Sequence, residues 1–398
     1  MSNRVTTQLD PFSEEFRSDP YSAYAELRAL GPIVWLEQHD CWAVSHYDAC
    51  RTILTDFETY SNAGGGGLEN YFKKAPWRKP SIILEVDPPE HTRTRTVLSR
   101  ALSPKVLRAI RTRFEEDAAA MVAEVKNKGE IEGVSELTRR YPLKVFPDSV
   151  GMAPDDRDNL LIYGSMVFGS FGPIIPWYEK FMADNAHVPE WIMERCQRKN
   201  LAPGGVGQMI YEASDRGEIT EEEAMMLVRT FLSAGVDTTV DSIGLCLRLL
   251  AENPDQYALL RDDPSLARAA FEEATRLDSS SQSLFRTTLR ETEFAGQKIA
   301  KHEKVMIFIG SAGRDPDVWE EPEKFDIQRQ IKGRQMGYGV GIHGCVGQMF
   351  ARLEAECFFQ AFAQQVETVT PAGPSEVRLH PGLRGLTKLP LHLTPKAA

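Results

Sequence analysis

The chain has 398 residues, of which 42% are hydrophobic and 26% charged, as is usual for soluble globular proteins. Its net charge of −11 argues against a nucleic-acid partner, because phosphate binding needs a basic surface. The first residues contain no apolar signal-peptide core and no membrane-spanning run, and the six cysteines form no C-x-x-C pair. We therefore predict a cytoplasmic protein with reduced thiols and no membrane anchor. No linker or repeat divides the chain, so residues 1–398 are expected to form one large domain.

Helical patterns dominate the sequence. Residues 19–31 and 47–56 predict short amphipathic helices on either side of a strand-like stretch over residues 32–46. The later predicted elements are helices at 104–125, 155–172 and 345–365 and short strands at 293–310 and 366–371. The expected fold class is therefore mainly α with a minor β part.

The clearest predicted element is a long helix over about residues 220–252. Thr220 and Glu223 match a capping box at its start, and the Asn253-Pro254 pair ends it. Its roughly 33 residues correspond to a length of about 50 Å. Because this helix is apolar on most faces, we expect it to cross the centre of the molecule.

The glycine-rich stretch GYGVGIHGCVGQ, residues 337–348, allows several interpretations. Gly339, Gly341 and Gly344 fit the dinucleotide pattern G-x-G-x-x-G, which would indicate a dehydrogenase. That pattern needs a buried strand directly before it, and residues 332–336 contain no β-branched residue. A zinc site is also disfavoured, because no second Cys/His pair accompanies His343 and Cys345. A buried structural cysteine is the plainest alternative.

The position of Cys345 favours another chemistry. It precedes a predicted helix, where free N–H groups and the helix dipole stabilise a thiolate. Glycines on both sides remove the Cβ atoms that would block a large planar ligand. A thiolate offered to a macrocycle is the haem-thiolate arrangement.

The loop over residues 337–347 resembles the signature F-G-x-G-x-H-x-C-x-G of cytochromes P450. The matching residues are Tyr338, Gly339, Gly341, His343, Cys345 and Gly347. Tyr338 departs from the usual Phe and adds a hydroxyl that needs a partner. The resemblance implies one large cytochrome P450 fold, haem b (iron protoporphyrin IX) with Cys345 as the iron ligand, and a long central helix that crosses over the haem.

Three further motifs resemble those of the family. Glu273 and Arg276 match E-x-x-R, a buried structural pair that a basic residue of a later segment completes. Here the resemblance assigns that role to Lys324, which cannot form the bidentate contact of an arginine. In the long helix, SAGVDTTV resembles the oxygen-activating motif, which implies that Ala234 lies over the haem and that Asp237 and Thr238 deliver protons to bound O2.

The third of these motifs is basic. The resemblance implies that four residues bind the two haem propionates, with arginine favoured because it pairs with carboxylates in a bidentate manner. The four residues are His91, Arg95, Arg286 and His343. Thr238 also argues against one alternative function, a haem-binding sensor without turnover.

Longer stretches resemble the para-methoxybenzoate O-demethylase-like subgroup. The implied activity is monooxygenation, by O-demethylation or hydroxylation, of a para-substituted benzoate or a methoxyphenol. The pocket residues implied by the resemblance are Phe168, Phe171, Ser233, Ala234, Thr238, Ser281 and Leu284. Gly64 stands where the subgroup is expected to carry an arginine for the substrate carboxylate, which favours a neutral substrate. Arg229 is the alternative cation, and the four glycines 64–67 predict a mobile lid.

The chain has no room for fused electron-transfer domains. The resemblance therefore implies a separate ferredoxin and an NAD(P)H-dependent ferredoxin reductase. A local basic patch near the cysteine loop is predicted to receive an acidic ferredoxin. Its residues are Arg93, Arg100, Lys105, Lys332, Arg334 and Arg352.

Overall fold

The computed structural model describes residues 4–76, 78–331 and 333–397. In its first half the helices are α1 (Glu14–Ser18), α2 (Tyr21–Leu30), α3 (Tyr47–Thr55), α4 (Glu90–Ala101), α5 (Pro104–Val125), η1 (Val134–Thr138), α6 (Arg140–Val150), α7 (Asp158–Gly169), α8 (Pro176–Asp184), α9 (Val188–Arg195) and η2 (Arg198–Asn200). In its second half they are α10 (Val206–Asp215), α11 (Glu221–Gly235), α12 (Asp237–Glu252), α13 (Pro254–Asp262), η3 (Pro264–Leu266), α14 (Ala267–Leu277), α15 (Ile309–Ala312) and α16 (Gln348–Gln365). The mainly α class is confirmed.

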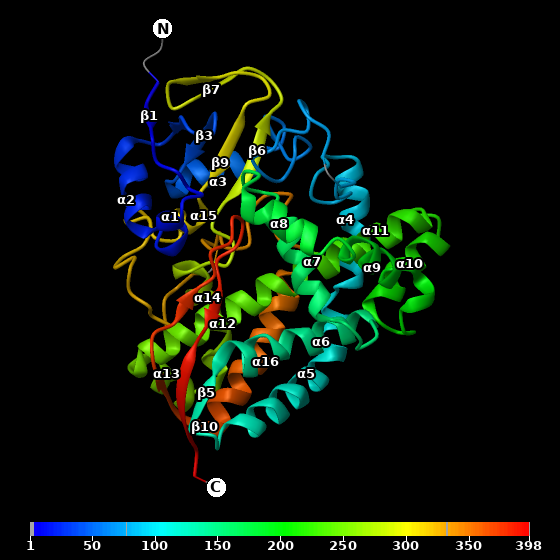
Figure 1. Cartoon of the computed structure of the whole chain (residues 1–398), viewed down its shortest axis with the longest axis vertical. Coiled ribbons are helices and arrows are strands. Elements are labelled where there is room, and N and C mark those ends of the chain that lie inside the picture. Colours follow the sequence, from blue (N-terminus) through cyan, green and yellow to red (C-terminus); the bar gives the residue numbers. More distant parts are fainter. Residues whose placement is uncertain (1–3, 77, 332, 398) are drawn as a thin grey trace.

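The strands are short and concentrate at two places. They are β1 (Thr6–Thr7), β2 (Val34–Leu36), β3 (Cys41–Val44), β4 (Tyr60–Ser61), β5 (Glu130–Glu132), β6 (Leu284–Thr288), β7 (Thr292–Phe294), β8 (Gln297–Ile299), β9 (Lys304–Ile307), β10 (Val366–Pro371), β11 (Glu376–Val377), β12 (Leu386–Lys388) and β13 (Pro390–Pro395). Six form a mixed sheet in the order β1-β2-β3-β9-β6-β4, near the N-terminus in Figure 1. A smaller antiparallel sheet, β10-β13-β5, lies near the C-terminus.

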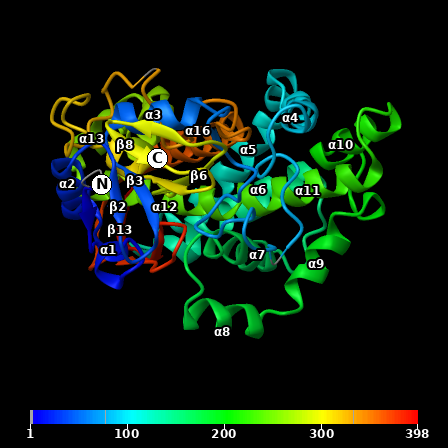
Figure 2. The same ribbon diagram turned by 90° about the horizontal axis from the view of Figure 1, so that it is seen from above.

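The predicted helices and strands agree with the observed ones, with one correction. The expected single helix over about residues 220–252 is divided into α11 and α12 at Val236, whose φ and ψ angles are −91° and −60°. The capping box of Thr220 and Glu223 is present at the start of α11. The two helices still run through the molecular centre, as Figure 2 shows, while α8 lies at the periphery between α7 and α9.

The largest part of the hydrophobic core lies among the helices. Val122, Leu247 and Phe358, from α5, α12 and α16, are fully buried in one cluster. A second cluster packs under the mixed sheet around Trp42 and Trp319. The cysteine loop joins these two regions, because residues after β9 and α15 lead through a long irregular segment to Cys345 and α16.

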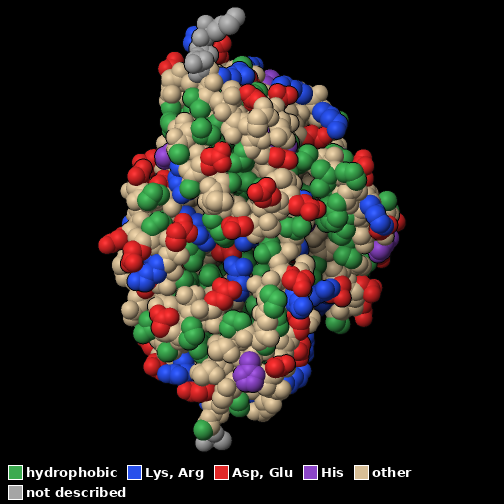
Figure 3. Space-filling view, turned by 60° about the vertical axis from the view of Figure 1, so that its left-hand side comes forward, with side chains coloured by type: hydrophobic (Ala, Val, Ile, Leu, Met, Phe, Trp, Pro, Cys, Tyr) green, Lys and Arg blue, Asp and Glu red, His purple; other side chains and the backbone are tan. Residues whose placement is uncertain are grey.

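No helix in the described ranges combines the length and the apolar composition that a bilayer crossing requires. On the face shown in Figure 3, acidic and basic side chains are interspersed among neutral surface.

Candidate active site

The glycine loop adopts a conformation fixed by main-chain hydrogen bonds. The amide of Cys345 donates to the Tyr338 carbonyl at 2.8 Å, and the Gly339 amide donates to the Met336 carbonyl at 2.8 Å. Gly341 has φ +76°, and a Cβ there would lie 2.5 Å from the carbonyl oxygen of Leu54. Only glycine fits such a position. Residues 333–336, directly before the loop, form a turn and irregular backbone rather than a strand, which argues against the dinucleotide interpretation.

Cys345 lies just before α16, and Gly347 caps that helix. Burial raises the pKa of the Cys345 thiol, whereas the N–H groups of Gly347 and Gln348 and the guanidinium of Arg95 lower it. The side chain is exposed to the cavity that it lines. The N–H groups and Arg95 favour the thiolate, while burial opposes it, so a metal ion in the cavity would be needed to hold the sulfur in its charged form.

The cavity over Cys345 has a volume of about 90 Å³. Phe231 and Ala234 of α11 and Thr238 of α12 line it together with Cys345, and Leu98 and Phe350 add further apolar side chains. The lining is therefore mostly apolar, and it includes a sulfur atom and residues on both sides of the helix break. An apolar lining of this kind beside a sulfur atom suits the face of a large planar ligand.

The break between α11 and α12 has a local cause. The Thr238 hydroxyl donates to the carbonyl of Ala234 at 2.8 Å and so occupies an acceptor within the helix. Gly235 is needed at the break, because a Cβ there would lie 2.1 Å from the ring of Phe146. The opening falls at the border of the Cys345 cavity, where Ala234 and Thr238 are both found.

Asp237 is not among the described residues that line this cavity, and its buried carboxylate belongs to an ion-pair group. Its carboxylate accepts a hydrogen bond from Arg378 at 2.9 Å and another from the Ser165 hydroxyl at 3.3 Å. Arg378 also pairs with Asp241. Burial raises the pKa of Asp241, and Arg378 opposes that shift. No sequence motif indicated Arg378, which approaches from the loop region between β11 and β12.

The four basic residues that were predicted to bind the propionates lie near one another, beside the cysteine loop. The rings of His91 and His343 are 4.4 Å apart, and Arg95 donates to the Gly344 carbonyl at 2.5 Å. Arg286 is buried and donates to two neutral oxygens, Asn62 Oδ1 at 2.7 Å and its own neighbour's carbonyl at 2.8 Å. Burial lowers the pKa of Arg286 to about 10.

The two histidines have unsatisfied nitrogens. Within the described residues, the Nε2 atoms of His91 and His343 are buried without a hydrogen-bond partner. Burial, together with the nearby His343 and Arg95, lowers the pKa of His91 to about 4. The Nε2 atom of His343 lies 3.8 Å from a carboxylate oxygen of Asp87, whereas buried polar atoms without any hydrogen-bond partner are rare in native proteins.

The E-x-x-R pair is buried as predicted, but its third member is different. The Arg276 guanidinium binds both oxygens of Glu273, at 2.7 and 2.8 Å. Arg329 completes the group with a contact of 3.0 Å to Glu273. Lys324 instead points to Glu321 on the exposed surface, at 3.3 Å, and offers Arg276 only its main-chain carbonyl. The prediction for Lys324 is therefore wrong, because its side chain faces solvent.

A second cavity of about 50 Å³ lies beside the first, and both are lined by Thr230 and Ala234. Phe168, Phe171 and Ser233 line it as predicted, and the two phenylalanine rings meet edge to face at 5.4 Å. We call this space the aromatic cavity. Its lining, within the described residues, does not include the predicted Ser281 and Leu284. Leu284 packs against the cysteine loop near Gly339 instead.

The aromatic cavity also contains two arginines, Arg78 and Arg229. Arg78 forms a bidentate pair with Glu85, with distances of 2.8 and 2.9 Å. Arg229 is buried, and its guanidinium donates to the carbonyl of Lys79 at 3.3 Å. Burial lowers the pKa of Arg229, and the neighbouring Arg78 adds to that effect. Arg78 and Arg229 carry two positive charges and Glu85 carries one negative charge, so these three groups leave a net positive charge at this wall of the aromatic cavity.

The prediction for Gly64 is also corrected. A Cβ at Gly64 would lie 2.3 Å from the hydroxyl oxygen and 2.6 Å from the Cβ of Thr287 in β6. A side chain at this position would therefore point into the sheet rather than into the aromatic cavity. The residues that supply positive charge to the cavity are Arg78, which the sequence interpretation overlooked, and Arg229.

Three members of the predicted basic patch are paired with glutamates. Arg93 pairs with Glu223, Arg100 with Glu218 and Arg352 with Glu272. Arg352 also lies over the ring of Tyr338, with 4.3 Å between the guanidinium carbon and the ring centroid. Lys332 lies outside the described residues. Burial strongly raises the pKa of the Tyr338 hydroxyl.

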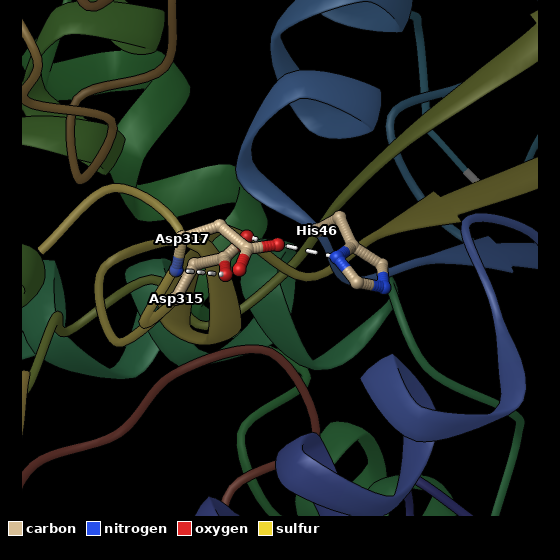
Figure 4. Close-up of side chains that lie close together, drawn as sticks. All are labelled: His46, Asp315 and Asp317. Carbon is tan, nitrogen blue, oxygen red and sulfur yellow. Dashed lines mark hydrogen bonds and ion pairs between the residues drawn. The ribbon is translucent and has the colours of Figure 1, made fainter.

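A separate group of potential metal ligands lies away from the two cavities. Figure 4 shows His46 facing Asp315 and Asp317. The carboxylate of Asp315 accepts the Tyr47 amide at 2.7 Å and the Asp317 amide at 3.1 Å, while His46 contacts the Arg28 carbonyl at 2.9 Å. These bonds fix the start of α3 and the turn after α15, which is a structural role.

Comparisons with known proteins agree with this geometry. A family model described as Cytochrome P450 matches residues 205–393. The chain is 46% identical over 388 residues to cytochrome p450 CYP199A2 of Rhodopseudomonas palustris, which covers 97% of this chain and 94% of that protein. It is 29% identical over 402 residues to a vitamin D(3) 25-hydroxylase of Pseudonocardia autotrophica, with 99% and 98% covered.

Solved structures share the fold. Cytochrome P450 CREJ in complex with (4-ethylphenyl) dihydrogen phosphate has a TM-score of 0.85 at 25% identity and covers 97% of this chain and 99% of its own. CYP109Q5 from Chondromyces apiculatus has a TM-score of 0.81 at 26% identity and covers both chains fully. Fold and site together define a haem-binding monooxygenase. The chain belongs to the cytochrome P450 family, whose members bind haem b, use O2 and take electrons from redox partners.

Proposed function

We propose that this monooxygenase acts on a small para-substituted aromatic carboxylic acid, by O-demethylation or hydroxylation. The observation that carries the proposal is the aromatic cavity, in which Phe168 and Phe171 face the cations Arg78 and Arg229. An aromatic ring fits between apolar walls, and a carboxylate in such a place must be paired with a cation. The shared residues Thr230 and Ala234 connect this cavity to the one over Cys345.

The proposed binding mode follows from the order of these groups. The acid group pairs with Arg229 and Arg78, with Ser81 and Thr230 as neutral hydrogen-bond partners on the same wall. The para substituent then extends past Ala234 toward the Cys345 cavity. The CREJ structure contains a para-substituted aryl phosphate, which is also an aromatic anion. This analogy supports the substrate class.

We further propose the roles of the cofactor residues. Cys345 ligates the iron, and His91, Arg95, Arg286 and His343 hold the two propionates, for which the unpartnered Nε2 atoms of both histidines are suited. Tyr338, Gly339 and Gly347 shape the loop against the macrocycle. The haem, when bound, supplies the activation of O2 and the transfer of one oxygen atom to the substrate.

The protein side chains handle protons and water. Thr238 presents a hydroxyl at the helix break, and Asp237 lies at the next buried position, held by Arg378. We propose that this acid and alcohol deliver protons through water to the reaction centre. Electrons are proposed to come from a separate ferredoxin and its NAD(P)H-dependent reductase.

One titration tests the substrate class. Ferric protein is titrated with 4-methoxybenzoate and, as a neutral isostere, with 4-methoxybenzamide, while the Soret band is followed. We expect a shift to the high-spin position and tighter binding for the acid. If the amide binds as tightly as the acid, or if neither shifts the band, the carboxylate assignment is wrong. Product formation with ferredoxin, reductase and NADH then separates an enzyme from a haem-binding sensor.

A further inference from the structure

Lys304 is a buried lysine at the start of β9, in the middle of the mixed sheet. Its side chain is almost inaccessible, and its ammonium donates to the carbonyl oxygens of Gly64 and Gly65, each at 2.8 Å. A buried ammonium needs compensating acceptors, and here two successive carbonyl groups of one loop provide them. The lysine therefore joins the sheet to the tetraglycine segment, residues 64–67.

The tetraglycine segment lies directly behind the wall of the aromatic cavity. A Cβ on Gly66 would lie 3.5 Å from both Leu84 and the ring of Phe171, and both of these residues line the cavity. Gly67 approaches the main chain of Phe171 so closely that a Cβ would lie 2.4 Å from its Cα atom. The next amide, that of Leu68, donates to the Phe171 carbonyl at 2.8 Å. Movement of the segment would therefore move Phe171.

Four successive glycines have no side chains to hold them and a large backbone freedom. The segment must be fixed from outside if Phe171 is to keep a defined position. Lys304 supplies two charge-assisted hydrogen bonds to it, which are stronger than neutral ones. The segment also makes two main-chain hydrogen bonds. The Gly65 amide donates to the Asn62 carbonyl at 2.9 Å, and the Gly64 carbonyl accepts from the Tyr71 amide at 3.0 Å.

We propose that Lys304 is a positioning residue for the substrate: by holding the carbonyl groups of Gly64 and Gly65, it keeps the tetraglycine segment against Phe171 and so sets the width of the aromatic cavity. This inference rests on the proposed function, because it assigns Phe171 to the substrate wall. Lys304 itself does not line the cavity and does not bind the acid group.

The charge of Lys304 changes near neutral pH. The pKa of its ammonium is lowered to about 7, chiefly by burial and to a smaller extent by Arg286. Three groups act in the opposite direction and raise the pKa, namely Glu85, Cys41 and Glu69. These groups come from the loops before α4, from β3 and from β6. The ammonium is charged below that pKa and neutral above it. Its bonds to the glycine carbonyls weaken as the pH rises through the pKa, so substrate affinity should fall in the same range.

The test compares Lys304→Met with Lys298→Met, an exposed lysine of the neighbouring β8. Amide hydrogen exchange is measured over residues 64–72 in substrate-free holoprotein, and binding of 4-methoxybenzoate and of imidazole is measured by the Soret shift. We expect exchange in this segment to be at least about tenfold faster in Lys304→Met and unchanged in the control. The Kd of the acid should rise about tenfold, with imidazole unaffected.

The pH profile provides the second readout. Between about pH 6 and pH 8.5, the Kd of the acid should rise with pH in the wild type and stay flat in Lys304→Met. Lys304→Gln, which keeps a neutral donor, should bind with intermediate affinity and also without the pH step, and it replaces the Met variant if that protein does not fold. Unchanged exchange over residues 64–72, or equal weakening of acid and imidazole binding, overturns the proposal. A wild type that does not bind the acid contradicts the proposed function instead, and the exchange measurement then decides the role of Lys304.

Discussion

The two adjoining cavities differ in how their polar groups are used. The cavity over Cys345 is lined by residues of the family motifs. Among the basic residues predicted for the cofactor, His91 has an Nε2 atom without a hydrogen-bond partner in the described residues, Arg286 donates to neutral oxygens, and His343 lies 3.8 Å from the Asp87 carboxylate. The aromatic cavity has cations from α11 and from the segment before α4, and one of them is already paired with Glu85. The cavity over Cys345 is therefore suited to a cofactor that stays bound. The aromatic cavity is suited to an exchangeable anion, whose affinity depends mainly on Arg229 because Arg78 is already paired.

The largest effect on activity is expected when the proposed iron ligand, Cys345, is replaced. Cys345→Ser removes the only sulfur that faces the larger of these two cavities among the described residues. We expect the reduced carbonyl complex to lose the red-shifted Soret band that thiolate ligation produces, and turnover to be abolished. The spectrum of the reduced, CO-treated protein measures this. A serine variant with an unchanged band would mean that another group ligates the iron.

Replacement of Arg229 in the aromatic cavity should weaken the binding of an acid more than that of a neutral ligand. Arg229→Leu leaves the acid without its unshared cation, so binding of 4-methoxybenzoate should weaken by about 2–3 kcal/mol, roughly a hundredfold in Kd. The binding of 4-methoxybenzamide should change little. Soret titrations of both ligands give the comparison. Equal losses for acid and amide would show that Arg229 only shapes the cavity.

The buried group of Glu273, Arg276 and Arg329 can be tested for its contribution to the stability of the fold. Arg329→Gln removes a charged hydrogen bond from buried Glu273 and should lower the free energy of unfolding by about 2 kcal/mol. Lys324→Gln is the matched control, because that side chain is exposed, and its effect should stay within about 0.5 kcal/mol. Thermal or denaturant unfolding of the two holoproteins measures the difference. A larger effect for Lys324 would restore the original assignment.

Thr238 lines the cavity over Cys345, and its hydroxyl donates to the carbonyl of Ala234, a residue that lines both cavities. Thr238→Ala should bind 4-methoxybenzoate normally, because the acid pairs with arginines at the other end. Reducing equivalents should be diverted to hydrogen peroxide, since the hydroxyl that assists proton delivery is missing. The ratio of product to NADH consumed, with peroxide assayed in parallel, is the measurement. Unchanged coupling would remove Thr238 from the proposed proton path.

The smallest effect is expected at the surface. Because Arg93, Arg100 and Arg352 are paired with glutamates, each single Arg→Gln change should alter ferredoxin-supported turnover by less than about threefold. Turnover measured at increasing ionic strength should accordingly fall only slightly. A steep loss with salt would indicate that these pairs open when the redox partner binds.

The sequence was sufficient for features that depend on local spacing. The glycine pattern around Cys345, the helix that follows it and the missing strand before it favoured a thiolate ligand over a dinucleotide site. The capping box of Thr220 and the E-x-x-R pair are equally local, since each needs only residues one helical turn apart. Both the capping box and the pair are present in the structure, because the backbone conformation that they require is encoded within a few residues.

Only the tertiary structure decided which distant side chains meet. Arg78 and Arg229 line one cavity although α11 and the segment before α4 are far apart in the chain. A side chain at Gly64 would point into Thr287, and Lys324 points to solvent while Arg329 reaches Glu273. In each case the deciding quantity is the direction of a side chain relative to a neighbouring element. That direction follows from the packing of whole helices and strands, which residue type and spacing along the chain do not specify.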